Sequence, residues 1–442
     1  MKETIIQFGT GNFLRGFAED FVAQMHRKGV YSGNVVIVSP TDSAQIAVLN
    51  AQQGRYNLYL RGMENDKPVS IRREIDVISR SINPYQDFDA FLALAENPDF
   101  HVIISNTTEA GIEYVADNSF SDRPAHTFPA KLTQLLYARY RLQLPGFIIL
   151  ACELVDKNGE RLQQCVLQYA KQWALPDAFC DWVTNSNHFC NTLVDRIVSG
   201  YPHEEAETML QEIGWKDRLL DTAELYALWA IEGDYEKEFP LKAAGINVQW
   251  CDDVSVFKKR KVRILNGLHT AMVFPALMCG LQTVGECMED VQFSIYIRRC
   301  LYNGILPVLG ETQENLDFAS SVLSRFANPY IKHRLQSIAL NSVSKFAARV
   351  LPTLLEIQSS GMQLPKTLIL SFAALLEYYK NHSVSDVPVC IEKIRGGSLA
   401  EILGDTSLWG TDLTGLLEPV GRAVERVQRG GMRAAVAWSI ED

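Results

Sequence analysis

Residues 7–17 read QFGTGNFLRGF, and this stretch decides the fold that we expect for the chain of 442 residues. It follows a short apolar run and precedes an amphipathic run, so it lies at a strand–turn–helix junction. Gly9 and Gly11 allow a tight turn and a close approach of the backbone to a pyrophosphate, which would bind at the N-terminus of the helix. The usual third glycine would stand at position 14, where the chain has Leu14, and Gly16 comes two residues later. We predict a dinucleotide-binding turn here, and the alternative is a turn that is only structural.

The segments around this turn alternate between strand-like and helix-like patterns. Strands are expected at residues 4–8, 35–39, 102–105 and 146–151, and helices at 15–28, 85–96 and 129–141. Such alternation is typical of a doubly wound parallel sheet. Residues 52–79 break the rhythm, and we expect an antiparallel excursion there.

Beyond residue 155 helical periodicity dominates, apart from a β-like patch at 246–250. Helices are expected at 291–306, 320–327, 331–351 and 367–379, with breaks at Pro307, Pro329, Pro352 and Pro365. The length calls for two domains. We predict an α/β N-terminal Rossmann-like domain with insertions at 1–254 and a mainly α-helical substrate and catalytic domain at 255–442.

Composition narrows the functional class. A net charge of −10 disfavours nucleic-acid binding, which needs a basic surface. No apolar run is long enough to span a membrane and the N-terminus has no signal-peptide pattern, so we expect a cytoplasmic protein. The nine cysteines form no C-x-x-C pair, which favours buried thiols over disulfides or a metal site.

Two further residues bear on the cofactor. Asp42 follows the second expected strand and would either hold the adenosine ribose or cap the helix expected near Ser43. Arg15 would either add a positive charge near the phosphates or be a surface arginine. No arginine stands directly after the second strand to receive a 2′-phosphate, so NAD is favoured over NADP.

Hydride transfer to a carbonyl requires a proton donor and hydrogen-bond donors for the developing alkoxide. A zinc mechanism lacks its ligands here. None of the 16 tyrosines is followed by lysine four residues later, which removes a tyrosine–lysine mechanism. Residues 261–270, KVRILNGLHT, offer Lys261 as general acid or base, Asn266 as an oxyanion donor and His269 as a substrate-positioning group. The alternative is a solvated basic turn that opens an ordinary helix.

These motifs resemble the polyol-specific long-chain dehydrogenase family, which includes mannitol 2-dehydrogenase and the hexuronate reductases. The family pattern K-x4-N-x2-H is matched by the lysine, asparagine and histidine above, and N-x-x-V-D-R-I by residues 191–197. The glycine turn has the family form G-x-G-N-F-x-R, and residues 325–332 with 345–349 are similar to its substrate-side helices. The resemblance implies that Asn191 shares the oxyanion role with Asn266, and that Asn12, Phe13 and Asn106 help to bind the cofactor.

Residues 105–112, 153–159 and 229–233 are most similar to the hexuronate reductases of that family. This implies metal-independent, reversible NADH-dependent reduction of D-tagaturonate to D-altronate in hexuronate catabolism. The alternatives are reduction of fructuronate and oxidation of mannitol or another polyol. A carboxylated substrate needs a cation, and the candidates are Arg325, Lys332, Lys345 and Arg349, each of which could equally be a surface charge.

Overall fold

The computed structural model describes residues 2–65, 67–107 and 111–441. The chain divides into two compact units. Unit 1 comprises Met1–Gly62 and Val69–Ser255, and unit 2 comprises Met63–Pro68 and Val256–Asp442.

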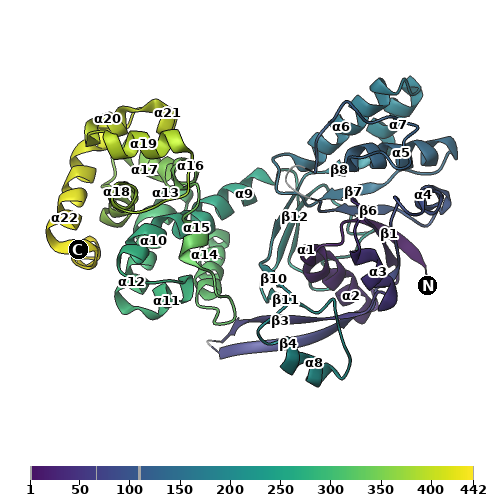
Figure 1. The fold of residues 1–442 in the computed structure, drawn as a ribbon, viewed down its shortest axis with the longest axis horizontal. Coiled ribbons are helices and arrows are strands. Elements are labelled where there is room, and N and C mark those ends of the chain that lie inside the picture. Colours follow the sequence, from purple (N-terminus) through teal and green to yellow (C-terminus); the bar gives the residue numbers. More distant parts are fainter. Residues whose placement is uncertain (1, 66, 108–110, 442) are drawn as a thin grey trace. The chain divides into compact units, whose positions relative to one another are not determined.

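The central sheet of unit 1 is six-stranded and parallel (Figure 1). Its strands are β1 (Glu3–Phe8), β2 (Asn34–Val38), β5 (Ile78–Ile82), β6 (Val102–Ser105), β7 (Ile148–Ala151) and β8 (His188–Cys190), in the order β5-β2-β1-β6-β7-β8. Numbered within the sheet, this is the order 3-2-1-4-5-6 of a Rossmann fold. The prediction of an α/β Rossmann-like domain is confirmed, and the order reverses between β1 and β6, where such folds bind ligands.

Helices cover both faces of this sheet. Ile5, Val35 and Ile104 pack with Phe17 and Leu49 on one face. Their chain neighbours face the other core, where α5, α6 and α7 pack. The helices of unit 1 are α1 (Asn12–Leu14), the π-helical turn η1 (Arg15–Glu19), α2 (Asp20–Arg27), α3 (Gln45–Ala51), α4 (Phe88–Leu92), η2 (Ala93–Glu96), α5 (Phe128–Arg141), α6 (Asn158–Gln172), α7 (Asp177–Ser186) and α8 (Ala206–Ile213).

Two smaller sheets complete unit 1. One has the order β10-β11-β3-β4, and the other the order β13-β12-β9. Their strands are β3 (Tyr56–Glu64), β4 (Lys67–Ile75), β9 (Thr192–Asp195), β10 (Val198–Gly200), β11 (Asp221–Glu224), β12 (Leu228–Glu232) and β13 (Val248–Cys251). The excursion expected at 52–79 forms as β3 and β4. The expectation of scarce strands beyond residue 155 is wrong for residues 188–232, because the strands there are short, and β9, β11 and β12 are largely buried without a regular alternation of polar and apolar residues.

Unit 2 is helical. Its helices are α9 (Ser255–Lys261, beginning at the last residue of unit 1), η3 (Val262–Asn266), α10 (Gly267–Met278), α11 (Val284–Glu289), α12 (Val291–Arg299), η4 (Cys300–Ile305), α13 (Leu306–Leu309), α14 (Gln313–Phe326), α15 (Leu335–Ile338), α16 (Ser342–Arg349), α17 (Leu351–Ser359), α18 (Lys366–Asn381), α19 (Pro388–Gly396), α20 (Leu399–Gly404), α21 (Thr406–Trp409), η5 (Thr414–Leu416) and α22 (Leu417–Ser439). The prediction of a mainly helical C-terminal part is confirmed.

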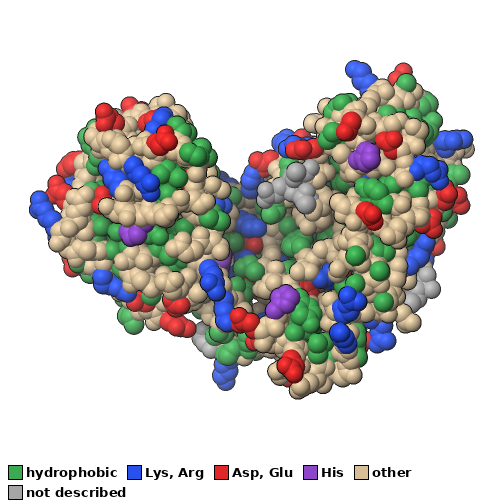
Figure 2. Space-filling view, in the orientation of Figure 1, with side chains coloured by type: hydrophobic (Ala, Val, Ile, Leu, Met, Phe, Trp, Pro, Cys, Tyr) green, Lys and Arg blue, Asp and Glu red, His purple; other side chains and the backbone are tan. Residues whose placement is uncertain are grey.

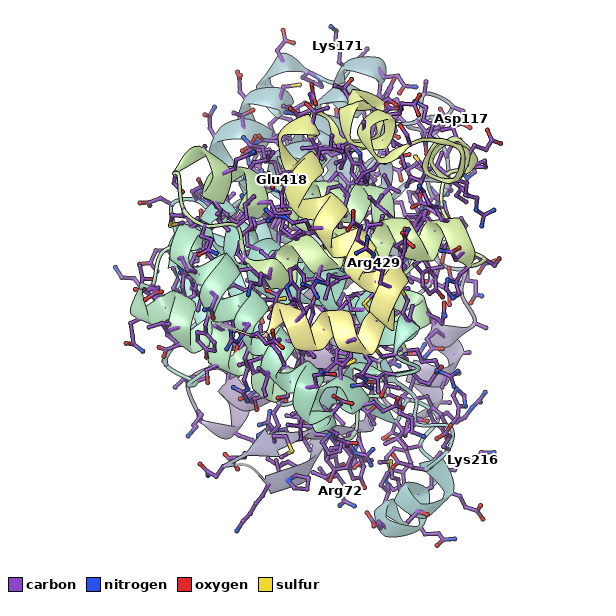
Figure 3. The ribbon with its side chains drawn as sticks, turned by 90° about the vertical axis from the view of Figure 1, so that its left-hand side faces the viewer. Arg72, Asp117, Lys171, Lys216, Glu418 and Arg429 are labelled. Atoms are coloured by element: carbon purple, nitrogen blue, oxygen red, sulfur yellow. The ribbon has the colours of Figure 1, made fainter. Side chains whose placement is uncertain are left out.

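Two details of unit 2 differ from expectation. The single helix expected at 331–351 is wrong, because residues 331–334 are not helical and three short helices follow. Pro307 ends no helix, because the chain continues without a break from α12 through the π turn η4 into α13, and such an irregular turn accommodates a proline. Helix α22 consists of two arms that meet at Gly431, where φ is +76°. Figure 3 shows Glu418 and Arg429 on its first arm.

On the face drawn in Figure 2, the Lys and Arg side chains are interspersed with Asp and Glu. In the part of the chain that the structure describes, no helix has the length and apolarity that a membrane crossing needs.

Candidate functional site

The glycine turn lies between β1 and α1, at the switch point of the parallel sheet. Gly9 has a φ of +136°, and a Cβ atom there would come within 2.7 Å of the Asn106 carbonyl oxygen. It would also lie 3.0 Å from Cδ1 of Leu14, the residue that replaces the third glycine. A Cβ on Gly11, by contrast, would meet no heavy atom within 4 Å. The turn therefore requires glycine at position 9 and leaves open space at position 11.

The residues beside the turn fit a dinucleotide. Gly11 caps the helix without any side-chain hydrogen bond, so the first N–H groups are not satisfied by a cap. Asn12 is exposed, and the half-buried Phe13 stacks on Phe17 with ring centroids 5.0 Å apart. The open space, the helix N-terminus and the carboxyl edge of the sheet together form a cradle of the kind that holds a pyrophosphate.

Arg15 is buried, so the alternative of a surface arginine is wrong. Its guanidinium donates to the Thr10 carbonyl oxygen at 2.8 Å and to Oδ1 of Asn12. Its Nε lies 3.8 Å from Oδ2 of Asp221, and the two side chains are 4% and 0% exposed. Arg15 thus braces the turn from inside the unit, and direct contact of this side chain with a phosphate stays a prediction.

Asp42 is exposed beyond the end of β2. Helix α3 begins at Gln45 without a side-chain cap, so the alternative that Asp42 caps a helix is wrong. Its carboxylate instead accepts a hydrogen bond of 2.7 Å from Nδ2 of the buried Asn83. The carboxylate is fixed at the edge of the sheet where the adenosine ribose binds in Rossmann folds, and its contact with a ribose stays a prediction.

Asn106 follows β6, on the opposite side of the switch point. Its backbone N–H donates to the Phe8 carbonyl oxygen at 3.0 Å, and its amide donates to the Cys152 carbonyl oxygen at 2.7 Å. Its own carbonyl oxygen is the atom that excludes a side chain from position 9. Asn106 therefore links the ends of β1, β6 and β7.

The predicted catalytic helix of unit 2 contains a π turn that the sequence does not reveal. The Gly267 N–H donates to the Val262 carbonyl oxygen, five residues back. In a regular α-helix, residues five apart are separated by about 140° around the axis. Because a π turn takes up one extra residue, it brings Lys261 and Asn266 toward one face. His269 is three residues beyond Asn266, on the same side of the helix.

His269 is buried, and its Nε2 has no hydrogen-bond partner among the described residues. Its ring lies 4.5 Å from that of Phe326 and 4.8 Å from that of His333, between centroids. Burial lowers the pKa of His269 well below its usual range, and His333, Arg325 and Arg349 lower it further. The imidazole is therefore neutral at neutral pH, with an unused polar atom in a positively charged setting.

Two of the four predicted substrate cations flank this histidine. Arg325 lies in the last turn of α14 and is buried, and Arg349 ends α16 with its guanidinium 3.5 Å from Oγ1 of Thr270. Lys345, one turn before Arg349, donates to the Ile338 carbonyl oxygen at 3.0 Å. Lys332 is exposed, in the non-helical segment before α15.

The sequence reasoning missed His333, whose pKa burial lowers. It stands directly after Lys332, on a segment expected to be helical, where a lone histidine gave no signal. The structure places this ring, rather than a lysine, against His269.

Asn191 belongs to unit 1 and is buried at the start of β9. Its Nδ2 donates to Oε1 of Glu160 at 3.1 Å and to Oε2 of Glu232 at 2.7 Å, and its Oδ1 accepts from the Glu160 N–H at 3.0 Å. Both amide hydrogens are therefore in use in this structure. The oxyanion role that the resemblance implied for Asn191 stays a prediction and would require one of these bonds to be exchanged.

The cysteines and possible metal ligands have a simple arrangement. All nine cysteines are free thiols. Among the described residues, no three His, Cys, Asp or Glu side chains are grouped so as to hold a metal ion.

A doubly wound sheet with a braced glycine turn, and a helical unit with a lysine–asparagine–histidine helix, together define a dinucleotide-linked oxidoreductase. The mannitol dehydrogenase Rossmann domain matches residues 3–243, and the mannitol dehydrogenase C-terminal domain matches residues 253–426. The chain belongs to the mannitol dehydrogenase family. It is an NAD-dependent oxidoreductase that acts on CH–OH groups.

Two relatives align with this chain over nearly the full length of both sequences. The altronate oxidoreductases of Escherichia coli O7:K1 and Yersinia enterocolitica serotype O:8 are each 41% identical, with 98% of this chain and 96% of theirs covered. Among solved structures, a D-sorbitol dehydrogenase in substrate-free form has a TM-score of 0.88 at 22% identity, over 99% of this chain and 95% of that one. The mannitol 2-dehydrogenase of Pseudomonas fluorescens, solved with NAD and D-mannitol, has a TM-score of 0.71 at 21% identity, over 99% and 94%. These two structures support the fold.

Proposed function

We propose that this enzyme catalyses the reversible NADH-dependent reduction of D-tagaturonate to D-altronate in cytoplasmic hexuronate catabolism. The relatives that share 41% of its residues over 98% of its length are named altronate oxidoreductases, and altronate is a sugar acid. The chemistry of unit 2 supports an anionic substrate of this kind.

The observation that carries the proposal is the setting of His269. A buried polar atom without a partner costs free energy of about 1–3 kcal/mol, so such an atom marks a position that a ligand group completes. The positively charged guanidinium groups of Arg325 and Arg349 flank it, and that of Arg349 lies 3.5 Å from Oγ1 of Thr270. A hydroxyl that pairs with the imidazole and a carboxylate that pairs with guanidinium would satisfy both needs.

In the proposed mechanism, protonated Lys261 delivers its proton to the oxygen of the substrate carbonyl as that oxygen gains negative charge. Asn266 donates a hydrogen bond to the same oxygen, and His269 holds a neighbouring hydroxyl. NADH, when bound, supplies the hydride. Arg325 and Arg349 hold the carboxylate and so fix which carbon faces the lysine.

The remaining predicted residues have supporting roles. Gly9, Gly11, Asn12, Phe13 and Arg15 shape the cofactor cradle, and Asp42 and Asn106 lie at the strand ends beside it. Asn191 is the proposed second oxyanion donor. Lys332 and Lys345 complete the proposed substrate-binding set, as charges that would strengthen the field for the carboxylate.

A substrate panel tests the proposal. NADH oxidation would be measured with D-tagaturonate, D-fructuronate, D-fructose and D-tagatose, and repeated with NADPH. We expect D-tagaturonate with NADH to give the highest kcat/KM. Preference for D-fructuronate or for an uncharged ketose would replace the proposed substrate with one of the alternatives, and preference for NADPH would contradict the role of Asp42.

A further inference from the structure

Buried polar side chains that the proposed mechanism does not use lie beneath the glycine turn. Nε2 of Gln7 donates to the Gly9 carbonyl oxygen at 3.0 Å and to Oε1 of Glu19 at 2.8 Å. The hydroxyl of Tyr56 lies 2.8 Å from the Arg15 carbonyl oxygen and 2.7 Å from Oε2 of Glu19. The turn and the start of the helix are thus held from below at several backbone atoms.

Among these buried side chains, Arg15 contacts the glycine turn on both sides of Gly11. It donates to the Thr10 carbonyl oxygen on one side of Gly11 and to the Asn12 side chain on the other. The carboxylate nearest to its guanidinium belongs to Asp221, which lies on β11 of the four-stranded sheet β10-β11-β3-β4. Oδ1 of Asp221 accepts from the Thr222 N–H at 2.8 Å. Oδ2 of Asp221 and Nε of Arg15 are buried without hydrogen-bond partners among the described residues.

We infer that Asp221 is a positioning residue for the dinucleotide: its ionised carboxylate holds Arg15, and Arg15 holds the loop in the shape that receives the pyrophosphate. This inference rests on the proposed use of NADH. The sheet that contains β10 and β11 also supports the helix after the turn, because Gly16 packs against Val198 of β10. A Cβ atom on Gly16 would lie 2.9 Å from Cγ1 of Val198. The helix that receives the phosphate is therefore seated on the sheet that carries Asp221.

The charges around Asp221 make its own ionisation variable near neutral pH. Burial raises the pKa of Asp221 to about 7, Arg15 and Arg196 lower it, and Glu19 raises it. The remaining group nearby, Tyr56, has its pKa raised by burial and by these carboxylates, so it stays neutral. Above pH 7 the carboxylate is charged and attracts Arg15, and below pH 7 this attraction is lost.

The sign of the stability effect separates positioning from simple structural support. The carboxyl has a higher pKa in the folded protein than in the unfolded chain, so the folded state prefers the protonated form. Stability contributed by this group is therefore greatest at low pH and declines as the pH rises toward 7. A neutral amide at this position should leave stability at pH 8 equal or higher, while it weakens the hold on Arg15.

The test is a fluorescence titration of NADH, without substrate, at pH 6 and pH 8, alongside thermal unfolding of the free protein. We expect Asp221→Asn to weaken NADH binding at pH 8 by about fivefold or more, with an unchanged or higher Tm, and to remove the pH dependence. Asp217→Asn is the matched control: this buried carboxylate accepts from the Asn57 and Leu219 N–H groups, so its loss should lower Tm and leave the Kd for NADH unchanged.

Two results would overturn the inference. One is an Asp221→Asn protein that binds NADH as tightly as the wild type at pH 8. The other, which needs no variant, is a wild-type Kd that does not fall between pH 6 and pH 8. A wild-type protein that binds no NADH at either pH would instead refute the proposed function, so the two failures are distinguishable.

Discussion

Two helices with the same irregularity, one in each unit, differ in how their polar groups are satisfied. Residues 12–27 of unit 1 and residues 255–278 of unit 2 each contain a π turn, η1 and η3. Within η1, Arg15 and Glu19 form hydrogen bonds with Thr10, Asn12, Gln7 and Tyr56, and Nε of Arg15, which has no hydrogen bond among the described residues, lies 3.8 Å from the Asp221 carboxylate. Beyond η3, Nε2 of the buried His269 has no hydrogen-bond partner among the described residues, and two guanidinium groups lie near the ring. At the first helix, contacts within the protein fix the polar groups in a shape that suits a cofactor. At the second helix, a buried polar group is available to bind a substrate.

The largest effect should come from the second helix. Lys261→Ala removes the proposed proton donor, so kcat at neutral pH should fall by about 10²–10⁴-fold. The Kd for NADH should stay within twofold of the wild type, because the cofactor cradle lies in unit 1. Lys258→Ala, in the same last turn of helix α9, is the control and should keep most of the activity. Turnover near the wild-type level in Lys261→Ala would refute the assignment.

Substitutions at two glycines distinguish the backbone conformation that the turn needs from the open space that it leaves for the cofactor. Gly9→Ala forces a side chain into a φ of +136° and against a backbone oxygen, which costs about 1–3 kcal/mol. Its Tm and its affinity for NADH should therefore both fall. Gly11→Ala meets no protein atom, so Tm should hold while NADH binding weakens by tenfold or more because the methyl group occupies the cradle. Equal NADH binding by wild type and Gly11→Ala would show that the pyrophosphate lies elsewhere.

A smaller effect is expected at the ribose end. Asp42→Ala removes a charged acceptor, and the loss of one such hydrogen bond corresponds to roughly tenfold in the Kd for NADH. NADPH should be affected less, because a 2′-phosphate no longer meets a carboxylate. The ratio of the two Kd values, measured by fluorescence, checks this. An unchanged ratio would contradict a role in cofactor discrimination.

The smallest effect concerns stability and pH. The pKa of His269 is lowered in the folded protein, so below about pH 6.5 the unfolded chain takes up a proton that the folded one does not. Stability should therefore fall by up to ~1.4 kcal/mol per pH unit as the pH drops through this range. His269→Gln should remove that part of the slope in urea unfolding at pH 5.5 and 7.5. An identical slope in the variant would show that the histidine takes up its proton over the same pH range in the folded and unfolded states.

The sequence predicted the cofactor-binding turn of unit 1 better than the proposed substrate site of unit 2. The central parallel strands and the glycine turn follow from local apolar runs and two glycines, which short-range patterns reveal. Asp221 and Asn83 could not be found in this way, because their partners Arg15 and Asp42 lie more than 40 residues away in the sequence. In unit 2, the spacing of Lys261, Asn266 and His269 was read as a regular helix. The π turn that brings the first two together depends on backbone hydrogen bonds that no residue pattern signalled.

The substrate-side charges show the same limit. Arg325 and Arg349 were named among four equal candidates, and only packing distinguishes them by placing both near one buried histidine. His333 gave no signal because residues 331–334 were expected to be helical, whereas the structure has no helix between α14, which ends at Phe326, and α15, which begins at Leu335.

The most direct test of this account is the ratio of kcat/KM for D-tagaturonate to kcat/KM for D-tagatose, the same ketose with a hydroxymethyl group in place of the carboxylate. It would be measured with NADH for the wild type and for Arg349→Leu. We predict a ratio of at least about 10² in the wild type, which falls by tenfold or more in the variant as the D-tagaturonate value drops, since a charged hydrogen-bonded pair is worth about 1.5–3 kcal/mol. A wild-type ratio near one, or a ratio that the variant leaves unchanged, would contradict the claim that unit 2 is built to hold a sugar acid.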